Sequence, residues 1–426
     1  MATNGPVVAD SGSSEARPFR SVPRGCGSTD FILVLAVLSA VSWAGLFWTI
    51  QPSWPRDILS IAALTVSALA GASKYRGPRG PWLVAWTLLG SAVVGLLVWS
   101  LTLSSRLGFN YWTGWSPWVP SMAFLVFGMA YGRRRVAAWQ DILIVGGSLA
   151  ALVQAVGLIC LGLGLVHVDP ISPDGDFYGT RPIHASLSML ILLAFILLLT
   201  RPLPASSARL ALTSVLGLSL VIGQHRSVWL ATVVAAAVLL YEGLRAGRVP
   251  RAVGLPLAVT GSYLALAVLI PLVTQYTLLP RLGSSKIAAA ALPDTVSSTH
   301  SLSWRFEMWS SSMSASRPIM NWLFGGVLGV NPVKWPGIGV SNPQITSHNM
   351  AIDVIVMFGL AGLVLMGYVF VRGILGPGVW RTPFGVFSLS LLAYGFFYPW
   401  PAWSWLAVGV AVSLGPISLG PRRVET

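Results

Sequence analysis

Charged side chains are scarce in this sequence. Only 9% of its 426 residues are charged and 54% are hydrophobic, whereas a typical soluble domain is about one quarter charged. Such a chain has too little polar side-chain material to cover a fold in water. This composition excludes an ordinary soluble enzyme and favours an integral membrane protein.

Cysteine and acidic residues are also few. The two cysteines, Cys26 and Cys160, form no CxxC pair and no disulfide framework, so we expect free thiols. The sequence has no acidic cluster suited to Mg²⁺, no phosphate-binding GxxxxGK[ST] loop and no Rossmann glycine pattern. We therefore expect neither a metal nor a cofactor, and no nucleotide-driven activity.

The net charge of +14 would suggest a nucleic-acid partner in a soluble protein. Here the arginines form short clusters between apolar runs, which is typical of membrane topology. No basic stripe with interleaved aromatic residues is present, so we expect no nucleic-acid partner.

The apolar runs predict an all-α polytopic membrane protein with about twelve transmembrane helices. Residues 1–30 are Gly/Ser/Pro-rich and are expected to form a disordered cytoplasmic tail. The run 31–50 is long enough to span a bilayer and favours an uncleaved signal anchor over a cleaved signal peptide. Further spans are predicted at about 57–73, 81–104, 117–132, 142–166, 185–200, 208–223, 227–244, 252–272, 349–371, 384–399 and 401–418.

These spans divide the chain into four further regions. Nine helices are expected within 31–272, and a long extracytoplasmic loop with short helices within 273–347. Helices ten to twelve are expected within 348–419, before a cytoplasmic tail at 420–426. Placing both termini in the cytoplasm puts most of the 27 basic residues on the inside, as the positive-inside rule requires. We expect a multi-pass protein of the bacterial plasma (inner) membrane.

All five histidines fall on the predicted outside, together with the long loop. Histidine is the side chain best suited to proton transfer near neutral pH. Three polar clusters precede helices that run inward: Arg181 with His184, Gln224-His225-Arg226, and His348-Asn349. Because helix N-termini attract anions, the added arginines predict a phosphate or pyrophosphate site at the outer face.

The individual residues also allow simpler interpretations. An interfacial arginine often only extends to lipid headgroups, but Arg226 lies in a very short turn between two spans with little access to bulk water. A helical stretch near 303–316 places Arg305 and Trp309 four residues apart on one face. This stretch is either an amphipathic helix on the membrane, anchored by its aromatic residues, or the carrier of a second phosphate ligand.

The predicted tenth span carries the most informative pattern. His348-Asn349 is followed after nine residues by Gly359 and then by Gly362. In a continuous helix His348, Gly359 and Gly362 share nearly one face, and glycines at this spacing allow another helix to pack closely. Asp353, one turn below Asn349, is either a functional group or a carboxylate that joins helices.

His348-Asn349-x9-Gly359-x2-Gly362 resembles the signature of the O-antigen ligase and O-antigen polymerase superfamily. The resemblance covers roughly residues 140–400 and includes the arginine turn at 226, the Arg305-x3-Trp309 helix and the Gly325-Gly326-Val327-Leu328-Gly329 segment. It implies a metal-independent, inverting membrane glycosyltransferase. Such an enzyme moves a glycan from undecaprenyl pyrophosphate to the hydroxyl of a glycan or lipid acceptor at the outer face of the membrane.

The resemblance also implies roles for individual residues. Arg226 and Arg305 would bind the pyrophosphate, and His348 would be the general base for the acceptor hydroxyl. Arg181 and His184 match a looser region of the family pattern, in which an Asn often replaces His184. Expected substrate-binding residues are Arg181, His184, His225, Trp309 and Asn349.

Two other classes of function remain open at this point. A transporter or flippase of a lipid-linked or anionic substrate often has a similar number of spans, but it usually buries charges in mid-span. A non-catalytic membrane scaffold would not need arginine and histidine gathered outside. The sequence does not distinguish a ligase from a polymerase and does not identify the sugar.

Overall fold

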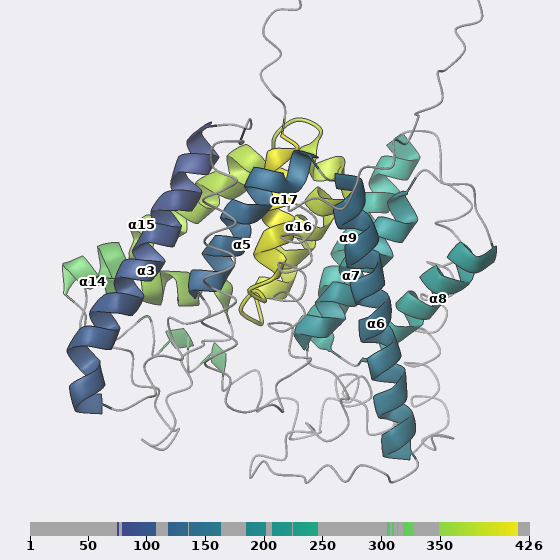
Figure 1. Cartoon of the computed structure of the whole chain (residues 1–426), viewed down its shortest axis with the longest axis horizontal. Helices are drawn as coiled ribbons and strands as arrows, with labels where there is room; N and C mark the ends of the chain where they lie inside the picture. The colour runs from purple at the N-terminus through teal and green to yellow at the C-terminus, as the bar shows by residue number, and fades with distance from the viewer. Residues whose placement is uncertain are drawn as a thin grey trace, which may run out of the picture.

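The computed structural model describes residues 75, 79–107, 118–134, 136–162, 185–201, 207–223, 225–245, 305–306, 309–310, 313, 318–327 and 349–415. Its regular elements over these residues are all helical (Figure 1). Four of the helices are long and apolar enough to cross a membrane: 79–97, 136–157, 227–245 and 350–373. Five shorter apolar helices of 10–17 residues accompany them. The expectation of an α-helical membrane protein is confirmed at this level.

Each apolar helix that the structure describes overlaps one predicted span, although some ends differ: α16, for example, ends at Gly395, before the predicted end at 399. The apolar helices are α3 (Arg79–Leu107), α5 (Trp118–Tyr131), α6 (Val136–Gly162), α7 (Ala185–Thr200), α8 (Ser207–Ile222), α9 (Arg226–Arg245), α15 (Met350–Gly373), α16 (Pro383–Gly395) and α17 (Ser404–Ser413). The predicted spans 31–50, 57–73 and 252–272 lie outside the described residues, so the count of twelve stays a prediction.

The centre of the bundle is formed by α5, α7 and α17. Every residue of α5 and α17 is buried, and α7 is buried from Ala185 to Leu199. Helices that are apolar on all sides belong in an interior. Small residues bring α5 and α17 together, because a Cβ at Gly128 would lie 2.4 Å from Leu406 O. This close approach between backbones is typical of membrane helix pairs.

The outer helices turn apolar side chains away from the bundle. On α6, five exposed residues follow a helical spacing along one face: Val145, Leu149, Leu152, Val156 and Ile159. An exposed stripe this long and apolar would be unfavourable in water. Lipid is the environment that it fits.

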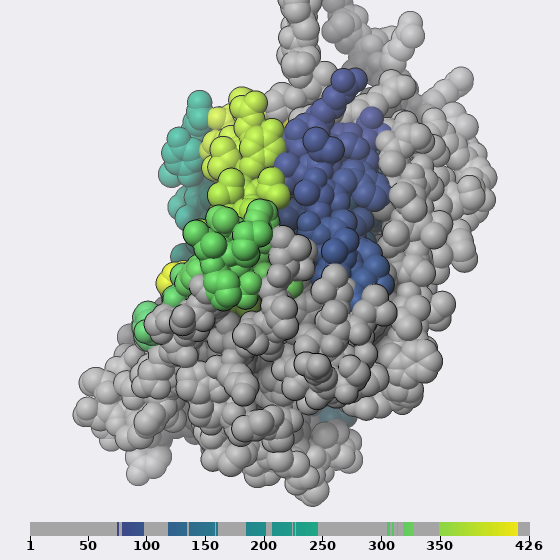
Figure 2. All heavy atoms as spheres, turned by 90° about the vertical axis from the view of Figure 1, so that its left-hand side faces the viewer, coloured from purple at the N-terminus to yellow at the C-terminus, as the bar shows by residue number. Residues whose placement is uncertain are grey.

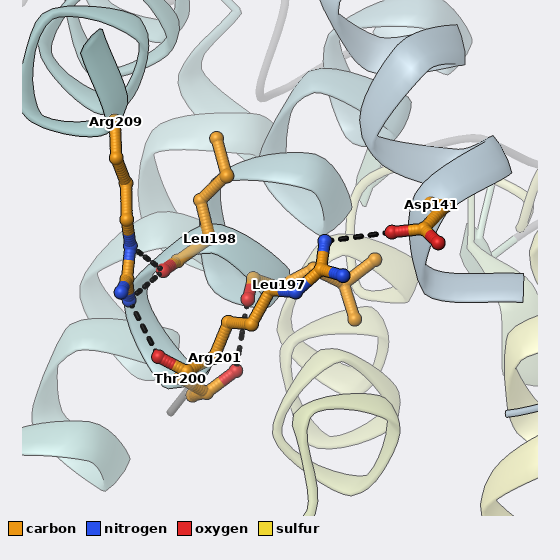
Figure 3. Close-up of polar contacts among 6 residues, drawn as sticks. All are labelled: Asp141, Leu197, Leu198, Thr200, Arg201 and Arg209. Atoms are coloured by element: carbon orange, nitrogen blue, oxygen red, sulfur yellow. Dashed lines mark hydrogen bonds and ion pairs between the residues drawn. The ribbon is translucent and has the colours of Figure 1, made fainter. Parts of the chain in front are cut away.

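Charged side chains join several helix ends. Arg201 at the end of α7 pairs with Asp141 of α6, with 2.6 Å between nitrogen and oxygen. Arg209 of α8 donates to the carbonyl oxygens of Leu198 and Arg201 (Figure 3), which satisfies carbonyls at the end of α7. The predicted topology puts the connection between these two spans, and with it both arginines, on the cytoplasmic side, and the structure places the two arginines at the same end of the bundle.

The glycine pattern in the tenth span acts differently from the prediction. Gly359 has a φ of 71° inside α15 and interrupts the helix there. Because α15 is not continuous across Gly359, the spacing that would align His348, Gly359 and Gly362 on one face does not hold. The prediction of one straight stripe is therefore wrong at Gly359, whereas the prediction that another helix packs closely on this glycine is confirmed, because a Cβ there would meet the backbone of Leu323. The short helix α14 (Ile319–Phe324) and the turn Gly325–Val327 pack on this break instead.

Candidate functional site

A short turn of aromatic residues after α16, residues 396–398, joins most of the predicted site residues that the structure describes. We call it the aromatic turn. It begins where α16 ends at Gly395, and it contains Phe396, Phe397 and Tyr398. The sequence interpretation took these residues as part of a span and missed their role. Their spacing carries no motif, so only the three-dimensional contacts identify them.

Arg305 lies over the aromatic turn. Its guanidinium carbon is 5.2 Å from the centre of the Tyr398 ring and 5.9 Å from that of Phe397, within the range of cation–π attraction. The side chain is half-buried, and its Nε makes no hydrogen bond to any described residue. Arg305 is thus held by aromatic faces, which leaves N–H groups for another acceptor.

Trp309, four residues after Arg305, contacts the same turn. Its ring meets that of Phe396 edge-on, with the centroids 5.6 Å apart. Arg305 and Trp309 both have helical backbones and both contact the aromatic turn. Residues 307–308 between them lie outside the described residues, so a shared helix face stays a prediction. Trp309 is buried, whereas the neighbouring Phe306 is 53% exposed.

Asn349 reaches the aromatic turn from the start of α15. Its Oδ1 accepts hydrogen bonds from the backbone N–H groups of Ala351 and Ile352, which is the geometry of an N-cap. Its Nδ2 donates to the carbonyl oxygen of Phe396 at 3.3 Å. These bonds give Asn349 a structural role, and a direct contact with substrate stays a prediction. The Asn349 cap fixes the start of α15, and His348 is the residue just before Asn349 in the chain.

Asp353 follows one turn later and is buried, 5% exposed. Its backbone N–H donates to the carbonyl oxygen of Asn349, and its carboxylate lies in the first turn of α15. A helix N-terminus stabilises a negative charge at that position. This position fits the structural interpretation of Asp353, and a functional role stays a prediction.

The turn before α9 lies at the same end of the bundle as the aromatic turn. At the other end of α9, Tyr241 packs on Trp380 and Glu242 pairs with Arg381, just before α16 begins. The two helices pack against each other. The end of α9 thus lies beside the start of α16, so the two helices run in opposite directions. Arg226 lies fifteen residues before Tyr241, which is about 22 Å along α9. The backbone of Arg226 is therefore level with the end of α16.

His225, next to that position, is 5% exposed. Its carbonyl oxygen accepts from the backbone N–H of Trp229, and the Trp229 indole donates to Leu220 O. These bonds tie the start of α9 to the end of α8. For Arg226 the structure describes only the backbone, so a role in phosphate binding stays a prediction.

Uncharged polar residues beside this turn were missed by the sequence interpretation. Gln154 of α6 donates to Ser219 O at 2.9 Å, and its Nε2 and the Ser188 hydroxyl both face Gly223. Gln154 and Ser188 are each 1% exposed. Single polar residues within apolar runs gave no spacing signal, so the sequence offered no means of finding this group.

Three predicted site residues, Arg181, His184 and His348, lie outside the described residues. The structure thus brings together Arg305, Trp309 and Asn349, and the convergence of Arg226, Arg305 and His348 stays a prediction. Within the described part of the chain, no group of three or more His, Cys, Asp or Glu side chains is arranged to hold a metal ion. No protein-family model matches the sequence, and no curated protein matches it.

Proposed function

We propose that this chain is a membrane glycosyltransferase of the O-antigen ligase and polymerase type. It would move a glycan from undecaprenyl pyrophosphate to an acceptor hydroxyl at the outer face of the bacterial plasma membrane. The proposal rests on the sequence resemblance and on the surroundings of Arg305. No metal is required in this reaction.

The observation that carries the proposal is the absence of a carboxylate partner for Arg305 among the described residues. Elsewhere in that part of the chain, Arg201 and Arg381 each pair with a carboxylate. A half-buried guanidinium without an anion is costly. A diphosphate supplies the missing negative charge, and arginine binds phosphate oxygens through two N–H groups at once.

The remaining roles follow from the chemistry of the reaction. His348 would accept the proton of the acceptor hydroxyl, and that oxygen would attack the anomeric carbon of the donor glycan. The bond between this carbon and the phosphate oxygen breaks, and the diphosphate leaves with the bonding electrons. Arg226 and Arg305 would stabilise the charge on the leaving diphosphate. Direct displacement inverts the anomeric configuration.

A transporter or flippase is the alternative. Coupled transporters usually bury ionisable groups in the middle of their spans. Among the described residues Asp353 is the only buried carboxylate, and it lies in the first turn of α15. This distribution favours the enzyme.

The proposal is tested with purified protein in proteoliposomes that contain an undecaprenyl-pyrophosphate oligosaccharide and candidate acceptors. We expect a longer or newly attached glycan on an acceptor and the release of undecaprenyl pyrophosphate, with no effect of EDTA. The molecule that gains the glycan would distinguish a ligase from a polymerase. Movement of the intact lipid-linked donor between leaflets, without any transfer, would instead support the transporter.

A further inference from the structure

The helix α14 presents an unusual surface for a segment of the loop predicted to lie outside the membrane. None of its six residues is buried. Four large apolar side chains are exposed: Ile319 at 73%, Met320 at 48%, Leu323 at 40% and Phe324 at 39%. Their positions at i, i+1, i+4 and i+5 form one face of the helix. In water this face would be a cluster of poorly solvated side chains.

The position of α14 in the bundle explains why its exposed face is apolar. It packs on α15, and the turn Gly325–Val327 that follows it packs on α15 and α3. Figure 2 shows α14 in green beneath the second part of α15 and beside α3. Both views place it level with α3 rather than beyond the end of α3 (Figures 1 and 2). Since residues 79–97 of α3 form a candidate span, α14 lies at the depth of that span.

The two helices that pack near α14 also expose apolar side chains. On α15, Val364 and Val371 are 70% and 57% exposed, and on α3, Val94 and Leu97 are 47% and 54% exposed. These side chains belong to helices that are long and apolar enough to cross the membrane. Lipid is therefore the expected neighbour of the whole surface, α14 included.

Several backbone groups of this segment are satisfied or buried, as a lipid environment requires. Polar backbone groups at membrane depth must be satisfied or buried in protein. Pro318 at the start of α14 has no N–H, and its carbonyl accepts from Asn321. At the other end, the N–H of Gly325 donates to Asn321 O. Gly325 is buried against the backbone of α15, so this residue of the irregular turn is shielded from lipid.

From these observations we infer that residues 318–327 form a re-entrant membrane segment whose exposed face contacts the acyl chains of the lipid bilayer. The segment turns at Gly325 and docks in the break of α15 at Gly359. This inference concerns the membrane topology and does not depend on glycan transfer.

Spin-label accessibility tests the inference in liposomes. Cys26 and Cys160 are replaced by Ser, and nitroxides are placed separately at Ile319→Cys and Leu323→Cys. Val364→Cys on the exposed face of α15 is the lipid reference, and Pro377→Cys in the exposed turn after α15 is the water reference. The measured quantity is the ratio of collisions with O₂, which partitions into lipid, to collisions with a water-soluble nickel complex.

We expect the ratios at 319 and 323 to match that at 364 and to exceed that at 377 several-fold. Ratios closer to the value at 377 would overturn the inference. Two positions are labelled in separate variants. If one variant fails to insert into liposomes, the other still tests the inference. Because no activity is measured, the outcome is independent of the proposed transferase function.

Discussion

Gly325 and Gly359 lie against each other's backbone, although they are far apart in the sequence. A Cβ on Gly325 would lie 2.5 Å from Gly359 N, and a Cβ on Gly359 would lie 2.3 Å from the Leu323 carbonyl carbon. Both residues have positive φ values, 61° and 71°, which side chains other than glycine rarely adopt. The contact joins the segment 318–327 to the break in α15.

This contact predicts that Gly359→Ala strongly destabilises the protein. The substitution adds an atom where backbone already lies and strains the positive φ, so we expect a loss of about 2 kcal/mol or more. Thermal unfolding in detergent measures the effect. Gly367→Ala in the same helix is the control, since a Cβ there meets nothing within 4 Å and alanine favours a helix. Equal effects of the two substitutions would contradict the proposed contact.

Arg305 is expected to be essential for transfer. Under the proposed function, replacing it with Ala removes the charge that would face the diphosphate and should lower the rate by about 10²–10³-fold. Arg305→Lys keeps the charge but loses the planar stacking and the paired N–H groups, so it should restore only part of the activity.

The matched control for Arg305 is Arg372→Ala. Arg372 is exposed in the last turn of α15, at the end opposite to Asn349, and its loss should leave transfer unchanged. Initial rates at saturating donor, with protein amounts normalised by gel filtration, provide the comparison. If Arg305→Ala and Arg372→Ala transfer at equal rates, Arg305 has no special role.

Asn349 combines two roles that substitutions can separate. Asn349→Ala loses both the N-cap and the bond to Phe396 O, and should cost about 1–2 kcal/mol. Asn349→Ser keeps a capping oxygen but is too short to reach Phe396 O. Its unfolding temperature should therefore lie between those of the natural protein and Asn349→Ala. If Ser and Ala are equally destabilising, the cap contributes little.

Two arginines at the end of α7 and the start of α8 predict another contrast. The Arg201–Asp141 pair is partly exposed, at 29% and 56%, and such pairs contribute about 0–1 kcal/mol. Arg209 donates to carbonyl oxygens at the end of α7, which otherwise lack partners in the helix. Arg209→Ala should therefore lower the unfolding temperature more than Asp141→Ala. The reverse order would show that the ion pair is the stronger interaction.

Much of the helical arrangement could be predicted from the sequence because membrane helices need long apolar runs, which are visible without an alignment. The helical backbone at Arg305 and at Trp309 was equally accessible, since it depends on the local sequence. The break at Gly359 was not, because the same glycines fit a straight helix until a second backbone, at Gly325, is placed against them. The aromatic turn was missed for a similar reason. Phe396, Phe397 and Tyr398 resemble ordinary span residues until Arg305 and Asn349 are seen to converge on them.

The central claim is that His348 serves a transferase site at the outer end of the bundle. Its most direct test is the transfer of glycan from undecaprenyl pyrophosphate by proteoliposomes that contain either the natural protein or His348→Ala. The account predicts transfer by the natural protein and its loss in His348→Ala, with both proteins equally expressed and folded. Undiminished transfer by His348→Ala would contradict the account, as would the absence of transfer by the natural protein with every acceptor supplied.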